Sequence, residues 1–190
     1  MLKPDYPLRT ERLILRPFTL GDLHDLHAFH SLPEVARYLY WEARDLDQTR
    51  QALEDKILRS ALYDEGQALS LAAELADTGV VVGDLTLFWH SRTHRHGEIG
   101  FVFNPAYHGR GLATEAAREL LRLGFEELGL HRVTGRCDAR NIRSARVMER
   151  LGMRREAHFV ENEFVKGEWT DEYVYAILRR EWLRQREPGA

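Results

Sequence analysis

Residues 104–116 read Asn-Pro-Ala-Tyr-His-Gly-Arg-Gly-Leu-Ala-Thr-Glu-Ala, and this stretch decides the fold. Apolar residues recur at every second position over 98–103, which predicts a strand just before it. Gly109 and Gly111 then open a segment with helical spacing of apolar residues over 112–128. A glycine turn that opens a helix presents backbone N–H groups together with the positive end of the helix dipole. The stretch therefore predicts a strand, a phosphate-binding turn and a helix.

The turn differs from two common nucleotide-binding motifs. It lacks the Lys-Ser/Thr ending of a Walker loop, which disfavours a nucleoside triphosphate. It also lacks the third glycine of a GxGxxG motif, because Thr114 stands three residues after Gly111. On the residues of this segment alone, a plain glycine turn that precedes a helix is an equally good interpretation.

Periodicity and turn residues divide the rest of the chain into alternating elements. The predicted strands cover 13–18, 68–75, 80–89, 98–103, 132–138, 154–164 and 169–178, and the predicted helices cover 20–30, 47–63, 112–128 and 141–151. This order predicts an α/β (or α+β) domain with a mixed central sheet of about seven strands and about four helices. No linker or repeat interrupts it, so we expect a single domain over 8–180 and a polar, frayed C-terminal tail over 181–190.

Composition narrows the function classes. The 190 residues are 44% hydrophobic with a net charge of −3, and no basic stripe suggests a nucleic-acid partner. No run of about 18 apolar residues predicts a membrane span, and the first residues do not resemble a signal peptide. Cys137 is the single cysteine, which excludes an internal disulfide and fits a cytoplasmic location. No histidine context supports Cys137 as a nucleophile.

Two segments resemble the signatures of the GNAT acetyltransferases. They are 108–113 (His-Gly-Arg-Gly-Leu-Ala) and 141–153, which begins Asn-Ile-Arg-Ser. The opening 10–17 (Thr-Glu-Arg-Leu-Ile-Leu-Arg-Pro) is similar to the start of the Rim-type ribosomal-protein N-terminal acetyltransferases. The likeness spans about 8–180. It implies the GNAT acyl-CoA N-acyltransferase fold, acetyl-CoA as co-substrate and no metal. One departure is His108, where the family loop usually has Gln or Arg.

The resemblance also implies where coenzyme A binds. Its pyrophosphate would lie on the N–H groups of the glycine turn, and its pantetheine arm would pair with the backbone of the preceding strand. Asn141 resembles the residue that contacts this arm, and asparagine also suits a helix N-cap. The alternative for this strand is an ordinary core strand with a packing glycine. The predicted cofactor-binding residues are Phe101, Val102, Phe103, Gly109, Arg110, Gly111, Leu112, Ala113, Thr114 and Asn141.

Two residues resemble the family's catalytic groups. Ser144 resembles the residue that faces the thioester sulfur, where a hydroxyl donates to the leaving thiolate. Glu98 resembles the acidic residue that removes a proton from the amine, often through water. This proton matters because an α-amine has a pKa near about 8 and a lysine amine near about 10.4. The alternatives are an ordinary first-turn serine and a strand-edge carboxylate that faces solvent. No activated nucleophile is evident, so the amine would attack the thioester directly.

The acceptor amine is less defined. Six carboxylates lie in 156–172 against Lys166 alone, and they either attract a cationic amine or solvate a hairpin: Glu156, Glu161, Glu163, Glu168, Asp171 and Glu172. The first interpretation is acetylation of a protein N-terminal α-amine, as the Rim-type resemblance suggests. The second is acetylation of a small amine such as a polyamine, amino acid or antibiotic. The third is a CoA-binding protein without turnover. Relatives are often dimers, so a homodimer is a further expectation.

Other polar and aromatic clusters have weaker interpretations. His90, His94 and His96 crowd one turn, but no carboxylate in fixed register supports a zinc site. Histidines at 24, 27 and 30 either frame an acceptor channel or occupy a half-exposed helix face. Three aromatic residues either wall an acceptor pocket or belong to the core: Tyr38, Trp41 and Trp89.

Overall fold

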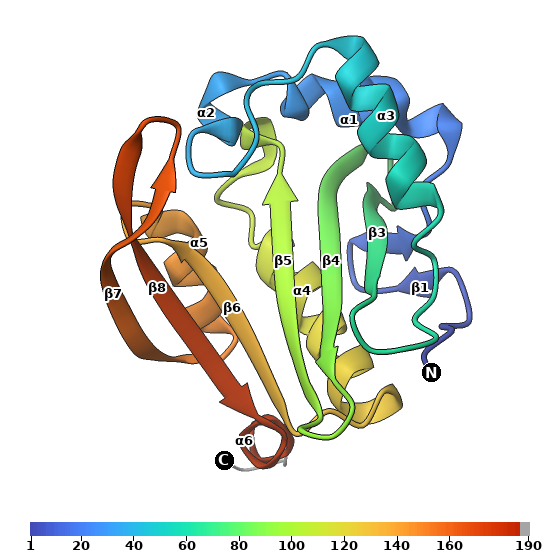
Figure 1. Cartoon of the computed structure of the whole chain (residues 1–190). Coiled ribbons are helices and arrows are strands. Elements are labelled where there is room, and N and C mark those ends of the chain that lie inside the picture. The colour runs from blue at the N-terminus through green and yellow to red at the C-terminus, as the bar shows by residue number, and fades with distance from the viewer. Residues whose placement is uncertain (187–190) are drawn as a thin grey trace.

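The computed structural model describes residues 1–186 and contains one mixed eight-stranded sheet (Figure 1). Its strand order is β1-β2-β3-β4-β5-β6-β8-β7. Only the pair β5–β6 is parallel among the described strands. In chain order the elements are β1 (Leu8–Arg9), β2 (Leu13–Arg16), α1 (Leu23–His30), α2 (Pro33–Ala36), α3 (Leu46–Ile57), β3 (Ala68–Leu75), β4 (Val81–Ser91), β5 (His96–Phe103), α4 (Leu112–Arg122), β6 (Arg132–Asp138), α5 (Ile142–Arg150), β7 (Arg154–Val165), β8 (Glu168–Leu178) and α6 (Arg179–Arg184). The mixed sheet predicted from the sequence is confirmed, with the two-residue β1 as an additional strand.

Helices cover both faces of the sheet. Ala116 and Leu120 of α4, with Met148 of α5, are buried in the larger apolar cluster on one face. Leu26 of α1 and Leu53 of α3 are fully buried in a smaller cluster on the other face. Side chains of β5 alternate between the two layers, as the period of a strand requires. The sheet thus positions β5 between two packed layers, with its C-terminal end beside the start of α4.

Strands β5 and β6 separate after a short ladder. Within these two fully described strands, pairing runs from His96 with Arg132 to Glu98 with Thr134 and then stops. Beyond that point β6 continues to pair with β8, and β5 continues to pair with β4. Figure 1 shows the two strands meeting at one end and diverging toward the loop before α4. The backbone edge of β5 that would face β6 is therefore open.

The prediction of a helix over 47–63 is wrong for its last six residues, 58–63. Helix α3 ends at Ile57, and the following residues take part in long-range pairing. Leu62 exchanges two backbone hydrogen bonds with Leu2, at 2.7 and 2.8 Å, and its side chain is fully buried. The carbonyl of Arg59 accepts from the amide of Ser70. These pairings with distant segments satisfy backbone groups that a longer helix would have satisfied locally.

The prediction of a frayed C-terminal end is also wrong for the residues that the structure describes there. Residues Arg179–Arg184 form α6, and Trp182 is 3% exposed against Phe125. The indole Nε1 donates to Glu126 at 3.1 Å. One large apolar side chain thus anchors a segment whose other residues are polar. Residues 187–190 of the predicted tail lie outside the described residues.

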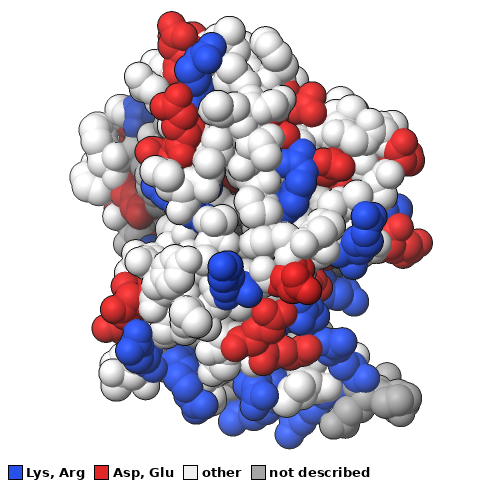
Figure 2. Space-filling model, turned by 90° about the vertical axis from the view of Figure 1, so that its right-hand side faces the viewer, with Lys and Arg blue, Asp and Glu red and all other residues white. Residues whose placement is uncertain are grey.

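The surface carries charges of both signs. On the face of the molecule next to β1 and β3, Lys and Arg side chains are interspersed with Asp and Glu, and basic side chains gather toward its lower end (Figure 2). No helix in the described part of the chain is both long and apolar enough to cross a membrane.

Candidate active site

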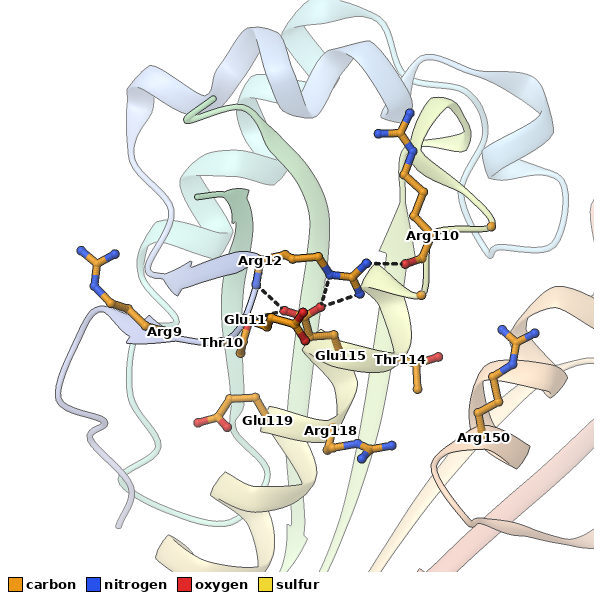
Figure 3. Close-up of a pocket in the computed structure, with 12 residues that line it drawn as sticks. Arg9, Thr10, Glu11, Arg12, Arg110, Thr114, Glu115, Arg118, Glu119 and Arg150 are labelled. Carbon is orange, nitrogen blue, oxygen red and sulfur yellow. Dashed lines mark hydrogen bonds and ion pairs between the residues drawn. The ribbon is translucent and has the colours of Figure 1, made fainter. Parts of the chain in front are cut away.

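Two glycines shape the loop that precedes α4. Gly109 and Gly111 have φ angles of +78° and +79°, which glycine adopts without the steric penalty of a side chain. Gly111 stands directly before the helix, whose first N–H groups have no partner within it. The loop and the first turns of α4 line a cavity of about 790 Å³ (Figure 3). The start of the helix therefore faces open space.

Cationic side chains surround this cavity. Arg9, Arg110, Arg118 and Arg150 line it, and none of the four forms a salt bridge with another described residue. Figure 3 shows Arg118 of α4 and Arg150 of α5 on either side of one space. The hydroxyl of Thr114, also in the wall, is buried without a hydrogen-bond partner in the described chain. Unpaired guanidinium groups, an unpartnered hydroxyl and a helix N-terminus fit a phosphate-bearing ligand.

The predicted pantetheine strand lies next to this loop. Phe101, Val102 and Phe103 pair with β4 on one side, and no described residue of β6 pairs with them on the other. Nε2 of His108 lies 3.1 Å from the carbonyl oxygen of Phe103, and Nη1 of Arg143 lies 3.2 Å from Nδ1 of His108. Arginine only donates, so Nδ1 accepts and the proton is on Nε2. His108 thus connects the loop to the end of β5 and to α5.

Asn141 and Ser144 stand together at the start of α5. The Asn141 side chain caps the helix, because its Oδ1 accepts from the amide of Ser144 at 3.2 Å. The Ser144 hydroxyl is near enough to the thiol of Cys137 on β6 to influence its pKa. Burial raises the pKa of Cys137 to about 12, and the Ser144 hydroxyl only partly opposes this rise. Cys137 therefore stays a neutral thiol, while Ser144 lies on the β6 side of the opening between the strands.

Glu98 belongs to a second cavity, of about 320 Å³, on the β6–β8 side of the opening. Its Oε2 lies 3.4 Å from Nε2 of His90 and 3.5 Å from the hydroxyl of Thr134. The Glu98 side chain is 24% exposed. Cys137, whose pKa is influenced by Ser144, also lines this cavity. Glu98 therefore shares a cavity wall with a neighbour of Ser144, although Ser144 itself is not part of the lining.

The hairpin β7–β8 contributes carboxylates to this second cavity. The hydroxyl of Tyr40 donates to Oε2 of Glu163 at 2.5 Å. Glu172 is 4% exposed and 3.2 Å from Nη2 of Arg136. Burial raises the pKa of Glu172, and repulsion from Glu163 and Glu98 adds to the rise, while Arg136 lowers it. Glu98 and Glu163 therefore disfavour ionisation of Glu172 within this cavity.

The family of the chain follows from comparison with known proteins. The model of the family described as "Acetyltransferase (GNAT) domain" matches residues 12–154 of this chain. The chain is a GNAT acetyltransferase. It is 35% identical over 176 residues to the uncharacterized N-acetyltransferase YnaD of Bacillus subtilis, covering 92% of this chain and 98% of that protein. It is 25% identical over 176 residues to the spermidine N(1)-acetyltransferase of Escherichia coli, covering 92% and 91%.

Solved structures agree with this assignment. A GNAT-family acetyltransferase from Bacillus anthracis has a TM-score of 0.82 and 34% identity, covering 92% of this chain and 99% of that one. GNAT acetyltransferases use acetyl-CoA, and the cationic cavity beside the glycine loop fits its phosphate groups. The narrower Rim-type resemblance stays a prediction.

The charge pattern predicted for the hairpin of this acetyltransferase needs correction. Arginines from other elements oppose its carboxylates, whereas the sequence segment alone offered only Lys166. Arg132 pairs with Glu156, Arg140 pairs with Glu168 at 2.8 Å, and Arg136 faces Glu172. Glu161 lies outside the cavity lining, at a bulge of β7 with φ of +49°. Strands far apart in the sequence supply these partners, so a count along one segment could not find them.

Sequence reasoning also missed Tyr40 and Arg136 as parts of the cavity wall. Of the three aromatic candidates, only Tyr38 lines it. Trp89 is a core residue at 5% exposure, and the ring of Trp41 packs on His30 with a centroid distance of 4.8 Å. An alternation of tyrosines over 38–40 before a loop was the only available signal for Tyr40.

The histidines have structural contacts. His30 is 1% exposed, and its Nε2 lies 3.4 Å from Oδ2 of Asp84. Nδ1 of His27 lies 3.1 Å from the hydroxyl of Thr49. The rings of His90 and His96 are 5.4 Å apart. Among the described residues, no group of three or more His, Cys, Asp or Glu side chains has an arrangement that could hold a metal ion.

Proposed function

We propose that this acetyltransferase transfers the acetyl group of acetyl-CoA to a protein N-terminal α-amine. The single observation that supports it most is the position of the small charged cavity. The cavity contains Glu98 and adjoins the open edge of β5, and its wall includes Cys137, whose pKa Ser144 influences. An amine placed there would meet a thioester held along β5. The cytoplasmic location and the homodimer remain predictions.

The proposed reaction is a direct displacement. The neutral amine nitrogen attacks the thioester carbonyl carbon, a C–N bond forms, and the C–S bond breaks. Backbone N–H groups on the open edge of β5 beyond Glu98 would stabilise the developing negative charge on the carbonyl oxygen. Glu98 accepts the proton that the amine loses, directly or through water. Ser144 donates a hydrogen bond to the departing thiolate, which takes up a proton to leave CoA with a free thiol.

The charges of the cavity favour an acceptor with one cationic group. Its carboxylates, including Glu98, Glu163 and Glu172, attract an ammonium group. Its wall also includes four cationic side chains, which disfavour a chain of several positive charges: Arg37, Arg136, Arg140 and Lys166. An N-terminal α-amine followed by neutral peptide groups fits a cavity wall that contains both carboxylates and cationic side chains.

Proton removal favours the same acceptor. With a pKa of about 8, roughly a tenth of an α-amine is neutral at pH 7. A lysine-like amine, with a pKa of about 10.4, is neutral to less than about 0.1%. The barrier to forming the nucleophile is therefore lower for an α-amine.

A small polyamine is the second candidate. Two observations favour it: Glu98, Glu163 and Glu172 line the same cavity, and the chain resembles the spermidine N(1)-acetyltransferase of Escherichia coli over most of its length. Several carboxylates in one cavity are suited to a polycation.

Release of free CoA thiol from acetyl-CoA separates these candidates. Short peptides with a free N-terminus and no lysine should support thiol release. The same peptides with an acetylated N-terminus are the matched control and should give none. Faster release with spermidine than with every free peptide would favour the second candidate. Binding of CoA without release for any amine would contradict catalysis of amine acetylation.

A further inference from the structure

A loop that turns its N–H groups toward a ligand must direct carbonyl groups elsewhere. In the glycine loop, the carbonyl of Arg110 is held by a residue 98 positions earlier in the chain. Nη1 of Arg12 donates to this oxygen at 2.8 Å (Figure 3). Arg12 directly precedes β2, so a residue fixed to the sheet holds the peptide group between Arg110 and Gly111. Gly111 lies in the left-handed region, and an added Cβ would be 3.5 Å from Nη2 of Arg12.

The same arginine faces a carboxylate that is badly placed for anion binding. Glu115 lies in the first turn of α4, lines the phosphate cavity and is 14% exposed. A negative charge at that position repels a phosphate group. However, its Oε1 accepts from the Thr10 hydroxyl at 2.6 Å and from the Arg12 amide at 2.8 Å. Its Oε2 accepts from Nε of Arg12 at 2.8 Å and lies 2.7 Å from Nη2. Both oxygens are therefore occupied.

Arg12 differs in this respect from the other arginines of the cavity. All three guanidinium nitrogens of Arg12 already contact protein oxygens. Arg9, Arg110, Arg118 and Arg150 form no salt bridge with described residues and remain free for a ligand. Arg12 is thus committed to the loop and to Glu115, whereas Arg118 and Arg150 lie on either side of the space beside α4 and are free to contact an anion (Figure 3).

We propose that Arg12 is a positioning residue for CoA binding, which holds the Arg110 carbonyl and cancels the charge of Glu115. Thr10 completes this assembly by occupying the second carboxylate oxygen. The proposal rests on the proposed function in one respect, namely that CoA is the ligand of the loop. It assigns a role to the Thr-Glu-Arg segment at 10–12, which the site chemistry otherwise leaves without one.

A set of substitutions separates positioning from direct contact. CoA affinity is measured by calorimetry for the wild type, Arg12→Ala, Glu115→Gln and the double variant. Arg12→Ala should weaken CoA binding about 10- to 100-fold, because it frees the carbonyl and exposes an unpaired carboxylate. Glu115→Gln alone should change affinity less than about threefold. In the double variant, loss of the repulsive charge should recover at least about fivefold over Arg12→Ala. Arg9→Ala serves as the control for simple loss of a positive charge from the cavity, and its affinity should not improve when Glu115→Gln is added.

A second readout keeps the test independent of folding. S-acetylpantetheine lacks the diphosphate and should be turned over by Arg12→Ala with an unchanged KM and kcat, while the KM for acetyl-CoA rises. Affinity of Arg12→Ala within twofold of the wild type would overturn the proposal. A double variant as weak as Arg12→Ala would overturn it too, since Arg12 would then act as an ordinary phosphate ligand. A wild type that binds no CoA would instead refute the proposed function.

Discussion

Nε2 of His108 lies 3.1 Å from the carbonyl oxygen of Phe103, so the loop before α4 is tied to the last residue of β5. The opposite ring nitrogen accepts from Arg143 of α5. This is the position where the family usually has Gln or Arg, and the backbone cradle alone does not require any particular side chain there. The observed contacts give the histidine a definite task, which is to fix the three elements around the opening of the sheet.

The first prediction follows from this contact. His108→Ala should weaken CoA binding about three- to tenfold, because one net hydrogen bond that orders the loop is lost. His108→Gln keeps a donor of similar reach and should stay within about twofold of the wild type. Calorimetric titration with CoA measures both. Unchanged affinity in the alanine variant would mean that the bond does not order the binding loop.

Gly111→Val should abolish measurable CoA binding while the protein remains folded. A β-branched side chain at φ of +79° strains the loop and fills the space where a phosphate would approach the backbone. Gly129→Val is the matched control, because Gly129 has φ of +73° and open space around its Cβ position. Both variants carry a similar strain, of about 1–3 kcal/mol. If the control loses CoA as well, or if Gly111→Val binds CoA normally, the loop is not the phosphate site.

Asp22→Asn should lower the free energy of unfolding by about 2 kcal/mol at neutral pH, through loss of a charged hydrogen-bonded pair. Asp22 is 5% exposed and accepts from both terminal nitrogens of Arg16, at 2.9 and 2.8 Å. Burial raises its pKa, but the bonds from Arg16 and from the Thr19 amide outweigh this and hold the pKa below its usual value.

The pH dependence of this effect has a definite sign. A carboxyl whose pKa is depressed in the folded state stabilises the fold above its unfolded pKa of about 3.9. That stabilisation is lost as the pH falls through the folded value. Denaturant unfolding should therefore show a constant gap between wild type and Asp22→Asn from about pH 5 to 8, and a narrowing gap below about pH 4. A gap independent of pH down to acid unfolding would contradict the ionic origin.

Local signals predicted the backbone of the glycine loop and the start of α5 well. Glycines at 109 and 111 have the left-handed φ that a tight turn needs, and Asn141 caps α5 as its residue type favours. Lys166-Gly167 joins β7 to β8 between the two strands predicted over 154–164 and 169–178. Each of these features depends on residues within a few positions of one another, so the sequence pattern contains the necessary information.

The acceptor side depends on contacts between distant segments. Tyr40 and Glu163 are 123 positions apart, and Arg136 meets Glu172 only because β6 pairs with β8. The same holds for the pairing of Leu62 with Leu2, which shortened the helix expected over 47–63. No local period encodes such pairs. They arise when the sheet assembles and brings side chains of separate strands and loops together.

Ser144→Ala should lower turnover about 10- to 100-fold and leave the dissociation constant of acetyl-CoA nearly unchanged. The proposed hydrogen bond strengthens as the thiolate leaves, so its loss affects the transition state more than the bound substrate. Cys137→Ala is the matched control, because it removes the thiol whose pKa Ser144 influences but leaves the hydroxyl in place. Turnover measured with saturating acetyl-CoA distinguishes the two. An equal loss in binding and rate would make Ser144 a structural residue.

Glu98→Gln should lower turnover at neutral pH while CoA affinity stays within about twofold of the wild type. If Glu98 accepts the amine proton, the acid limb of the wild-type pH–rate profile should vanish in the variant. Glu163→Gln is the control within the same cavity: it removes the carboxylate that bonds Tyr40, so it should raise the KM for the amine but keep the acid limb. Rates of thiol release across a range of pH, with CoA affinity measured in parallel, test both variants. Identical profiles for wild type and Glu98→Gln would exclude Glu98 as the base and leave the proton to water or to another carboxylate of the cavity.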